Sequence, residues 1–321
     1  MRALTYAGYG SSSQLALCDL PAPQPGRGEV LVRVCAAALN PKDVFTLKGR
    51  FRFLSGRRFP KIVGLDFAGE VAAAGPGRVP LRPGDPVYGF LSGFSALRGT
   101  VAEQVVVPEG WLAAKPRRAS FEEAAAIALA GSTALQALRD VARVQPGDRV
   151  LIHGASGGVG ALAIQLAKLY GAHVTSTSSA ASLERCRALG ADEALDRDAG
   201  DFLTRVRDLR VVFDVFGNLS LSRVRPALRP GGVFVTTVPS RRILLDTVRT
   251  ALGAVRARLV SVRPRTADLE LLARHVDDGR LRPQIDRVFP FEEAAEAVRH
   301  VESRRAHGKV VVSIAPTKAG S

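Results

Sequence analysis

The residues best suited to chemistry form a glycine-rich turn near the middle of the chain. The turn reads HGASGGVG from His153 to Gly160, and an apolar run precedes it. Gly157 and Gly160 take the second and third glycine positions of the G-x-G-x-x-G pattern, and Ala155 takes the first. Small residues let the backbone approach a pyrophosphate, and a helix N-terminus offers free N–H groups to it. The turn therefore predicts a dinucleotide-binding site, with contacts at Ser156, Gly157, Gly158, Val159 and Gly160.

The end of the next predicted strand, about 20 residues further on, favours NADP(H) over NAD(H). NAD-binding proteins usually carry an Asp or Glu there, which binds the ribose 2′-hydroxyl. Residues 176–179 are all Ser or Thr, so no acid repels a 2′-phosphate, and we expect Ser178 and Ser179 to bond it. Arg185 and Arg197 are the nearby basic candidates, and for each the alternative is an ordinary surface position.

Alternating strands and helices surround this turn. We expect strands at 149–153, 173–177, 211–215 and 233–238, and helices at 159–170, 183–189 and 219–228. Such alternation predicts a parallel sheet covered by helices on both faces. Ser120 with Glu123 forms a capping box that predicts the first helix of this region.

The first 120 residues have a different rhythm. Short strands are expected at 29–35, 69–73, 86–88 and 102–107, separated by Gly- and Pro-rich turns. This rhythm is typical of a small barrel or sandwich. The tail returns to helices at 269–277 and 292–303 and ends on a strand at 309–314.

Composition excludes several classes of protein. The 321 residues carry a formal net charge of +15, but only seven of the 45 basic residues are lysines and the arginines are scattered, which favours a solvated surface over a nucleic-acid site. The three cysteines lie far apart without metal-ligand spacing. No window approaches the roughly 18 apolar residues of a membrane span. The N-terminus carries no secretion signal, so we expect a soluble cytoplasmic protein with no membrane partner.

The order and spacing of several motifs resemble the medium-chain dehydrogenase/reductase superfamily, in its zinc-free, quinone-oxidoreductase-like and enoyl-reductase branch. Besides the glycine turn, the motifs are Gly28-Glu29-Val30-Leu31-Val32, Asn40-Pro41-Lys42-Asp43, Gly64-Leu65-Asp66-Phe67-Ala68-Gly69, Gly84-Asp85-Pro86-Val87-Tyr88, Gly131-Ser132-Thr133-Ala134, Leu189-Gly190-Ala191-Asp192 and Gly308-Lys309-Val310-Val311. The resemblance implies an α/β fold. A Rossmann domain with a doubly wound parallel sheet, residues 122–264, is inserted into a barrel-like, GroES-like β-rich catalytic domain formed by residues 1–121 and 265–321.

The same resemblance bears on metal and reaction. The first cysteine ligand of the zinc-dependent members aligns with Asn40 and their histidine ligand with Leu65, and the structural zinc loop has no counterpart. Because a zinc site needs about four suitable donors, we expect no metal. We then expect NADPH-dependent hydride transfer to the activated C=C bond of an enone, enal or enoyl thioester. The alternatives are an NADPH:quinone reductase and, from another class, an NADPH-binding protein with a nucleic-acid or regulatory role.

The resemblance also assigns site residues. Asn40 is expected beside the nicotinamide, where it bonds coenzyme or substrate, and the alternative is a turn residue before Pro41. Lys42 is expected to stabilise an enolate oxygen or relay a proton, and the alternative is a solvated lysine paired with Asp43. Asp43 and Asp66 are expected to fix loops through backbone hydrogen bonds. Further coenzyme contacts are expected at Thr133, Arg197, Phe216, Gly217 and Val238, and the resemblance implies a homodimer.

The sequence departs from its relatives near the expected substrate entrance. Phe45, Leu47 and Phe51 stand where many relatives carry Tyr or Arg, and Ala181 stands where a basic residue often follows the second strand. Residues 50–59 alternate Arg and Phe. One interpretation is an aromatic wall whose arginines steer an anionic carrier, such as a coenzyme A or acyl-carrier thioester; the other places Phe in the core and Arg in water.

Overall fold

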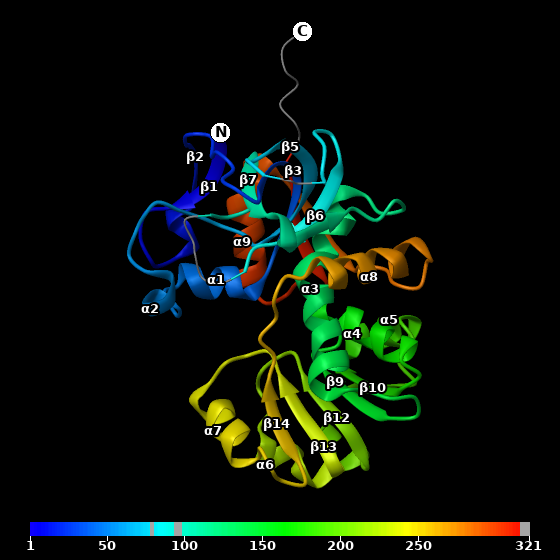
Figure 1. Cartoon of the computed structure of the whole chain (residues 1–321). Helices are drawn as coiled ribbons and strands as arrows, with labels where there is room; N and C mark the ends of the chain where they lie inside the picture. Colours follow the sequence, from blue (N-terminus) through cyan, green and yellow to red (C-terminus); the bar gives the residue numbers. More distant parts are fainter. Residues whose placement is uncertain (78–79, 93–97, 315–321) are drawn as a thin grey trace. The chain divides into compact units, whose positions relative to one another are not determined.

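The computed structural model describes residues 1–77, 80–92 and 98–314, which fold into two compact units (Figure 1). Unit 1 consists of Met1–Leu129, Arg263–Gly279 and the chain from Pro283 onward, and unit 2 consists of Ala130–Val262 with Arg280–Arg282. The predicted boundaries were 121/122 and 264/265, and the last seven residues of the predicted tail segment lie outside the described ranges. Helix α3 (Phe121–Gln136) runs through the first division, so no linker in the sequence marks it.

Unit 2 contains a six-stranded sheet in which every neighbouring pair is parallel. The strand order is β11-β10-β9-β12-β13-β14. The strands are β9 (Arg149–His153), β10 (His173–Ser178), β11 (Glu193–Asp196), β12 (Leu209–Asp214), β13 (Leu228–Thr236) and β14 (Arg256–Leu259). The order reverses at β9, which confirms the predicted doubly wound sheet and adds β11 and β14 to it.

Helices connect these strands. They are α4 (Gly158–Leu169), α5 (Leu183–Ala188), α6 (Leu221–Val224) and α7 (Arg241–Arg249). The helix expected over 219–228 was predicted too long: α6 ends at Val224 and Arg225–Ala227 forms a 3₁₀ turn, because Pro226 lacks the N–H that a longer helix needs. Residues 150–152 of β9 are fully buried, as expected for a central parallel strand.

Unit 1 is built on a seven-stranded sheet, counted over the described residues. Six strands follow the order β15-β16-β3-β5-β6-β8, and β7 pairs with β3. The strands are β3 (Glu29–Leu39), β5 (Asp66–Ala74), β6 (Pro86–Phe90), β7 (Gln104–Pro108), β8 (Leu112–Ala114), β15 (Ile285–Pro290) and β16 (Lys309–Ser313). A smaller sheet contains β2 (Ala16–Asp19), β1 (Arg2–Tyr6) and β4 (Lys61–Ile62).

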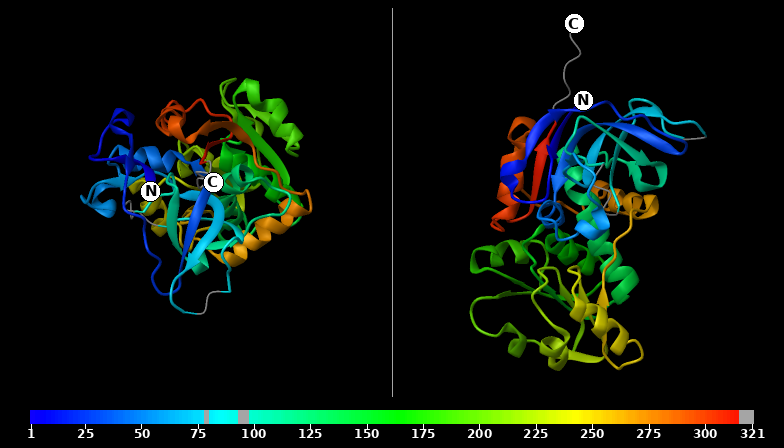
Figure 2. Two further views of the ribbon diagram at one scale, coloured as in Figure 1. Left: turned by 90° about the horizontal axis from the view of Figure 1, so that it is seen from above. Right: turned by 90° about the vertical axis from the view of Figure 1, so that its left-hand side faces the viewer.

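The end of the chain completes this unit. Strand β16 pairs antiparallel with β3, so the red C-terminal strand lies beside the blue N-terminal strands in Figure 2. The helices are α1 (Pro41–Leu47), α2 (Arg52–Ser55), α8 (Thr266–Asp277) and α9 (Ala294–Glu302). Early and late residues share one core, in which Val34, Phe67, Phe289 and Val310 are all buried. The predicted GroES-like domain, interrupted by a Rossmann domain, is thereby confirmed.

The predicted capping box at the start of α3 is present. The Ser120 N–H donates to Glu123 Oε2 at 2.8 Å, and the Glu123 N–H donates to Ser120 Oγ at 3.2 Å. Among the described residues, no helix has the length and hydropathy needed to cross a bilayer.

Candidate functional site

The glycine turn joins β9 to α4 at the carboxyl end of the sheet in unit 2. The N–H groups of Gly154 and Ala155 both donate to the Thr177 carbonyl oxygen, at 3.2 and 3.0 Å, which holds the turn against β10. Gly154 has a φ of 83°, a left-handed value that favours glycine. A Cβ on Gly160 would lie 2.3 Å from the Gly154 carbonyl oxygen, so α4 approaches the turn too closely for any side chain there. The tight turn itself therefore depends on Gly154, and the neighbouring Ala155 is buried.

The N-terminus of α4 fits a pyrophosphate. The helix begins at Gly158, and the N-cap Gly157 has no side chain with which to satisfy the first N–H groups. A Cβ on Gly157 would meet only the Gly154 carbonyl oxygen, at 3.7 Å, so the described residues leave space in front of the turn. Ser156 and Val159 are half-buried beside it. An anion can therefore reach the N–H groups at the positive end of the helix dipole.

The end of β10 brings the predicted 2′-phosphate residues together. Ser178 is buried, and its hydroxyl donates to the Ser179 carbonyl oxygen at 3.2 Å and lies 3.7 Å from Cys186 Sγ. The Arg197 N–H donates to the Ser178 carbonyl oxygen at 2.9 Å. The Arg197 guanidinium lies 5.4 Å from the centre of the Phe216 ring. Ser179, Arg197 and Phe216 thus lie along one edge of the sheet, whereas Ser178 Oγ is bonded within the protein; their contacts with a 2′-phosphate stay a prediction.

The loop after β12 is held by a buried carboxylate. Asp214 Oδ1 accepts the Gly217 N–H at 2.7 Å, and Asp214 Oδ2 accepts the Leu219 N–H at 2.9 Å. Gly217 has a φ of 80°, and a Cβ there would lie 2.3 Å from Val238 Cγ2. The predicted coenzyme residues Gly217 and Val238 are therefore in direct contact, at the carboxyl ends of β12 and β13.

His153 is a residue of this site that the sequence analysis did not single out. Its Nδ1 lies 2.6 Å from Thr177 Oγ1 and its Nε2 lies 2.7 Å from Asn218 Oδ1. The ring stacks on Phe202, with centroids 5.1 Å apart, and meets Phe216 edge-on at 6.0 Å. Burial lowers the pKa of His153 despite the nearby Asp214 carboxylate, whose own pKa burial raises. The only signal in the sequence is a polar residue at the end of an apolar strand.

These contacts assign a role to the His153 ring. The side-chain oxygen Oδ1 of Asn218 can only accept a hydrogen bond, so His153 Nε2 carries the proton and His153 Nδ1 accepts a hydrogen bond from the Thr177 hydroxyl. The neutral ring thereby ties together the ends of β9 and β10 and the loop that follows β12. The His153 ring contacts the Phe216 ring, and the Phe216 ring in turn contacts the Arg197 guanidinium. His153 is therefore a positioning residue for the edge at which the predicted coenzyme contacts gather.

The second group of predicted residues lies in unit 1, around a buried ion pair. Lys309 Nζ lies 2.9 Å from Asp66 Oδ2 and donates to Asn40 Oδ1 at 2.8 Å. Asn40 Nδ2 donates to Asp66 Oδ2 at 2.7 Å, and Asp66 Oδ1 accepts the Leu129 N–H at 2.6 Å. Lys309 is 4% exposed and Asp66 is fully buried. Lys309 and Asp66 thus hold the oxygen and the nitrogen of the Asn40 side-chain amide. Lys309 entered the sequence analysis only as part of a motif.

Lys42 and Asp43 follow Asn40 at the start of α1. Asp43 Oδ2 accepts the Asn40 N–H at 2.7 Å, which confirms the expected loop-fixing role of Asp43, whereas the backbone partner of Asp66 is the Leu129 N–H inside helix α3. Burial raises the pKa of Asp43 to about 7. Lys42 is half-buried, and burial lowers its pKa while the Asp43 carboxylate opposes that shift. A lysine in such a setting loses its proton more readily than a solvated one.

The other expectations are placed as follows. Thr133 is buried in α3, within unit 2. The contacts described above bring together the residues of the glycine turn with Ser179, Arg197, Phe216, Gly217 and Val238, all in unit 2, while Asn40 and Lys42 belong to unit 1. Within residues 1–77, 80–92 and 98–314, no three His, Cys, Asp or Glu side chains gather where they could hold a metal ion.

Comparisons with known proteins agree with this geometry. The model of the alcohol dehydrogenase GroES-like domain matches residues 26–117, and the model of the zinc-binding dehydrogenase matches residues 189–312. The chain is 34% identical to a chloroplastic quinone-oxidoreductase homolog of Spinacia oleracea, over 97% of this chain and 98% of that protein. It is 34% identical to an NADPH-dependent alkenal/one oxidoreductase of Arabidopsis thaliana, over 97% of this chain and 79% of that protein.

A solved structure gives the same result. The quinone oxidoreductase from Coxiella burnetii superposes with a TM-score of 0.90 at 31% identity, covering 98% of this chain and 99% of that one. The fold of the chain is thus shared by a protein that is similar to it over 98% of its length. The chain belongs to the medium-chain dehydrogenase/reductase superfamily, in its quinone-oxidoreductase-like branch, and is an NAD(P)H-dependent oxidoreductase.

Proposed function

We propose that this oxidoreductase works without zinc, prefers NADPH and reduces the activated C=C bond of a small enone, enal or enoyl thioester. The observation that carries the proposal is the cluster of Asn40, Asp66 and Lys309. Asn40 aligns with a zinc ligand of the zinc-dependent relatives, and here it accepts an ammonium hydrogen bond at 2.8 Å. The same ammonium pairs with the one carboxylate of the cluster. The Lys309 ammonium thus contacts the residue that aligns with a zinc ligand of those relatives.

The chemistry of the substrate follows from this arrangement. Without a Lewis acid an alkoxide is hard to stabilise, whereas the enolate from a conjugated C=C bond delocalises its charge. The nicotinamide ring, when bound, supplies the hydride to the β-carbon. Lys42 is the residue to which we assign stabilisation of the enolate oxygen or relay of a proton, and the assignment is supported by burial, which makes its ammonium a better acid. The Asn40 side-chain amide, two residues before Lys42 in the sequence, is held in one orientation by Asp66 and Lys309.

The preference for NADPH is supported by the edge formed by Ser179 and Arg197. No carboxylate follows β10 directly, and the Arg197 backbone is bonded to the strand end. A guanidinium pairs well with a 2′-phosphate. We expect Arg197→Ala to lower kcat/KM for NADPH about tenfold and to leave kcat/KM for NADH within about twofold. Equal losses with both coenzymes, or a wild-type enzyme that favours NADH, contradict the preference.

Quinone reduction is the second candidate, favoured by relatives that are named quinone oxidoreductases. A hydroquinone delocalises the developing charge as an enolate does, so the same site is suited to either substrate. The decisive experiment follows NADPH oxidation with enones, enals, enoyl thioesters and quinones in parallel. A kcat/KM for quinones above that for every alkene contradicts our first choice, and stoichiometric zinc in the purified active protein contradicts the zinc-free assignment.

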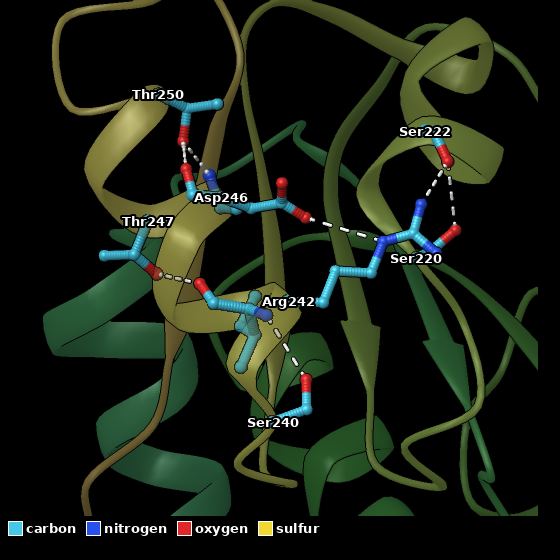
Figure 3. Close-up of polar contacts among 9 residues, drawn as sticks. Ser220, Ser222, Ser240, Arg242, Asp246, Thr247 and Thr250 are labelled. Atoms are coloured by element: carbon cyan, nitrogen blue, oxygen red, sulfur yellow. Dashed lines mark hydrogen bonds and ion pairs between the residues drawn. The ribbon is translucent and has the colours of Figure 1, made fainter.

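We also propose a homodimer, formed through the outer face of α7 and the edge strand β14. Side chains cap both ends of α7, and Figure 3 shows Ser240 at one end and Thr250 at the other. Ser240 Oγ accepts the Ile243 N–H at 3.2 Å, and Thr250 Oγ1 donates to the Asp246 carbonyl oxygen at 2.6 Å. Helix α7 carries three exposed apolar side chains, Leu244, Leu245 and Val248, and the exposed Leu252 follows three residues after the helix ends. An unpaired strand edge beside an apolar face suits a two-fold interface. Light scattering on wild type and Val248→Glu tests this: we expect a dimer and a monomer, and a dimeric variant contradicts the interface.

A further inference from the structure

Residues 50–58 of unit 1 present apolar side chains to solvent. The short helix α2 lies in this segment, and its Phe53 and Leu54 are 88% and 67% exposed. The sequence left open whether these phenylalanines enter the core. Phe59 packs against the core, since the centre of its ring lies 6.0 Å from that of Tyr6 and 5.1 Å from that of Tyr9. Phe53, in contrast, is exposed to solvent. Exposing Phe and Leu side by side is costly for a segment without a binding partner.

The charge of the same segment is entirely positive. No acid occurs between Asp43 and Asp66, a stretch with six basic residues. Two of these are used within the fold: Lys48 pairs with Glu302 at 2.6 Å, and Lys61 is fully buried. The remaining four are exposed, and no ion pair with a carboxylate is found for them in the described part of the chain: Arg50, Arg52, Arg57 and Arg58. Four exposed cations therefore flank two exposed apolar side chains in the sequence.

A buried lysine holds the base of this segment in place. Lys61 Nζ donates to the Ser55 carbonyl oxygen at 2.7 Å and lies 5.1 Å from the centre of the Phe59 ring. The Tyr9 hydroxyl bonds Ser55 Oγ at 2.6 Å and the Gly56 carbonyl oxygen. These contacts hold Ser55 and Gly56, at the C-terminal end of α2, against the rest of unit 1. The exposure of Phe53 is therefore a built feature of the fold.

The chemistry of the segment selects its partner. Two apolar side chains on one helical turn are too few for a stable protein interface, which buries about 800 Å² per partner. They are sufficient to enter the boundary between lipid headgroups and acyl chains, where aromatic and aliphatic residues insert while basic residues bind anionic phosphates. We propose that residues 50–58 dock this enzyme on an anionic lipid surface, with Phe53 and Leu54 inserted and the four arginines on the headgroups.

Docking has a consequence for substrate supply. The segment begins three residues after the last residue of α1, and the Arg50 N–H donates to the Phe45 carbonyl oxygen of that helix at 3.0 Å. Because α1 also carries Lys42, an apolar substrate dissolved in the bilayer is presented next to the helix with the predicted catalytic lysine. The docking itself does not depend on which reaction the enzyme catalyses.

The test is sedimentation of the full-length protein with vesicles at physiological salt. We expect binding to vesicles of phosphatidylcholine with phosphatidylglycerol and none to phosphatidylcholine alone. Arg57→Gln/Arg58→Gln should weaken partitioning about 25-fold, since each arginine contributes roughly fivefold, or about 1 kcal/mol. Phe53→Ser/Leu54→Ser should weaken it at least about tenfold. The matched control, Arg117→Gln/Arg118→Gln, removes the same charge from an exposed doublet elsewhere and should stay within about twofold of wild type.

The outcomes separate docking from its rivals. Equal losses in the two arginine doublets mean that the net charge alone attracts the protein, and they overturn the proposal. Unchanged binding of Phe53→Ser/Leu54→Ser overturns it too, as does Phe53→Trp fluorescence that brominated lipids fail to quench. If a crotonyl-loaded acyl carrier protein binds through these arginines while vesicles do not, the surface serves an acidic carrier instead. Urea unfolding of each variant with the midpoint of the wild type shows that the variant is folded.

Discussion

Replacing Lys309 by methionine should destabilise unit 1 strongly. The substitution keeps much of the apolar stem but removes an ammonium that pairs with Asp66 at 2.9 Å and bonds Asn40 at 2.8 Å. Asp66 then keeps its hydrogen bonds from Asn40 Nδ2 and the Leu129 N–H, but its buried charge has lost its counter-ion. Removing one partner of a buried pair costs about 3–5 kcal/mol. A loss of that size lowers the unfolding temperature on the order of 10 °C.

Urea unfolding followed by tryptophan fluorescence measures this directly. Trp111 is the only tryptophan of the chain and packs against the core of unit 1, so its emission reports the unit that contains the ion pair. Asp66→Asn should cost a similar amount, since it leaves the Lys309 ammonium buried without a carboxylate. The double variant Asp66→Asn/Lys309→Met should cost less than the sum of the single variants by at least about 2 kcal/mol, because both charges are gone. Additive losses, or a cost below about 1 kcal/mol for Lys309→Met, would refute the reasoning.

Three further predictions concern pH, catalysis and the coenzyme site. Asp43 binds its proton more tightly in the folded state, with a pKa of about 7 against 3.8. The free energy of unfolding should therefore fall as pH rises from about 4 to about 7, by at most roughly 4 kcal/mol. Urea unfolding at several pH values should show a flatter pH dependence for Asp43→Asn, and an equal dependence contradicts the assignment. Lys42→Ala should lower kcat on an enone at least about 10²-fold in stopped-flow assays, with partial rescue by Lys42→Arg, and an unchanged kcat removes Lys42 from the chemistry. His153→Leu should weaken NADPH binding about tenfold in fluorescence titrations, while His153→Asn recovers part of the loss; equal affinity in all three proteins contradicts the positioning role.

The parts of the fold that were predictable are those coded by neighbouring residues. The glycine turn and the capping box of Ser120 and Glu123 each depend on a few consecutive positions, and both are present. The strands of unit 2 were predictable because buried parallel strands read as apolar runs. Strand β14 (Arg256–Leu259) was missed, because an edge strand with alternating arginines lacks that signature. Gly154 was missed as the tight-turn residue, since the motif alone does not reveal which position has a positive φ.

The candidate site was predictable only in part. The sequence by itself determined a strand–turn–helix for a pyrophosphate and the absence of an acid after β10, because these features depend on backbone conformation and residue type within a short segment. Only the tertiary structure decided that Lys309 meets Asn40 and Asp66, across 269 and 243 residues of chain. It also decided that Phe59 is packed and Phe53 is exposed, although both lie in one Arg–Phe pattern. The physical reason is the same in both cases: burial and charge pairing depend on which distant segments pack together, and local periodicity carries no information about those partners.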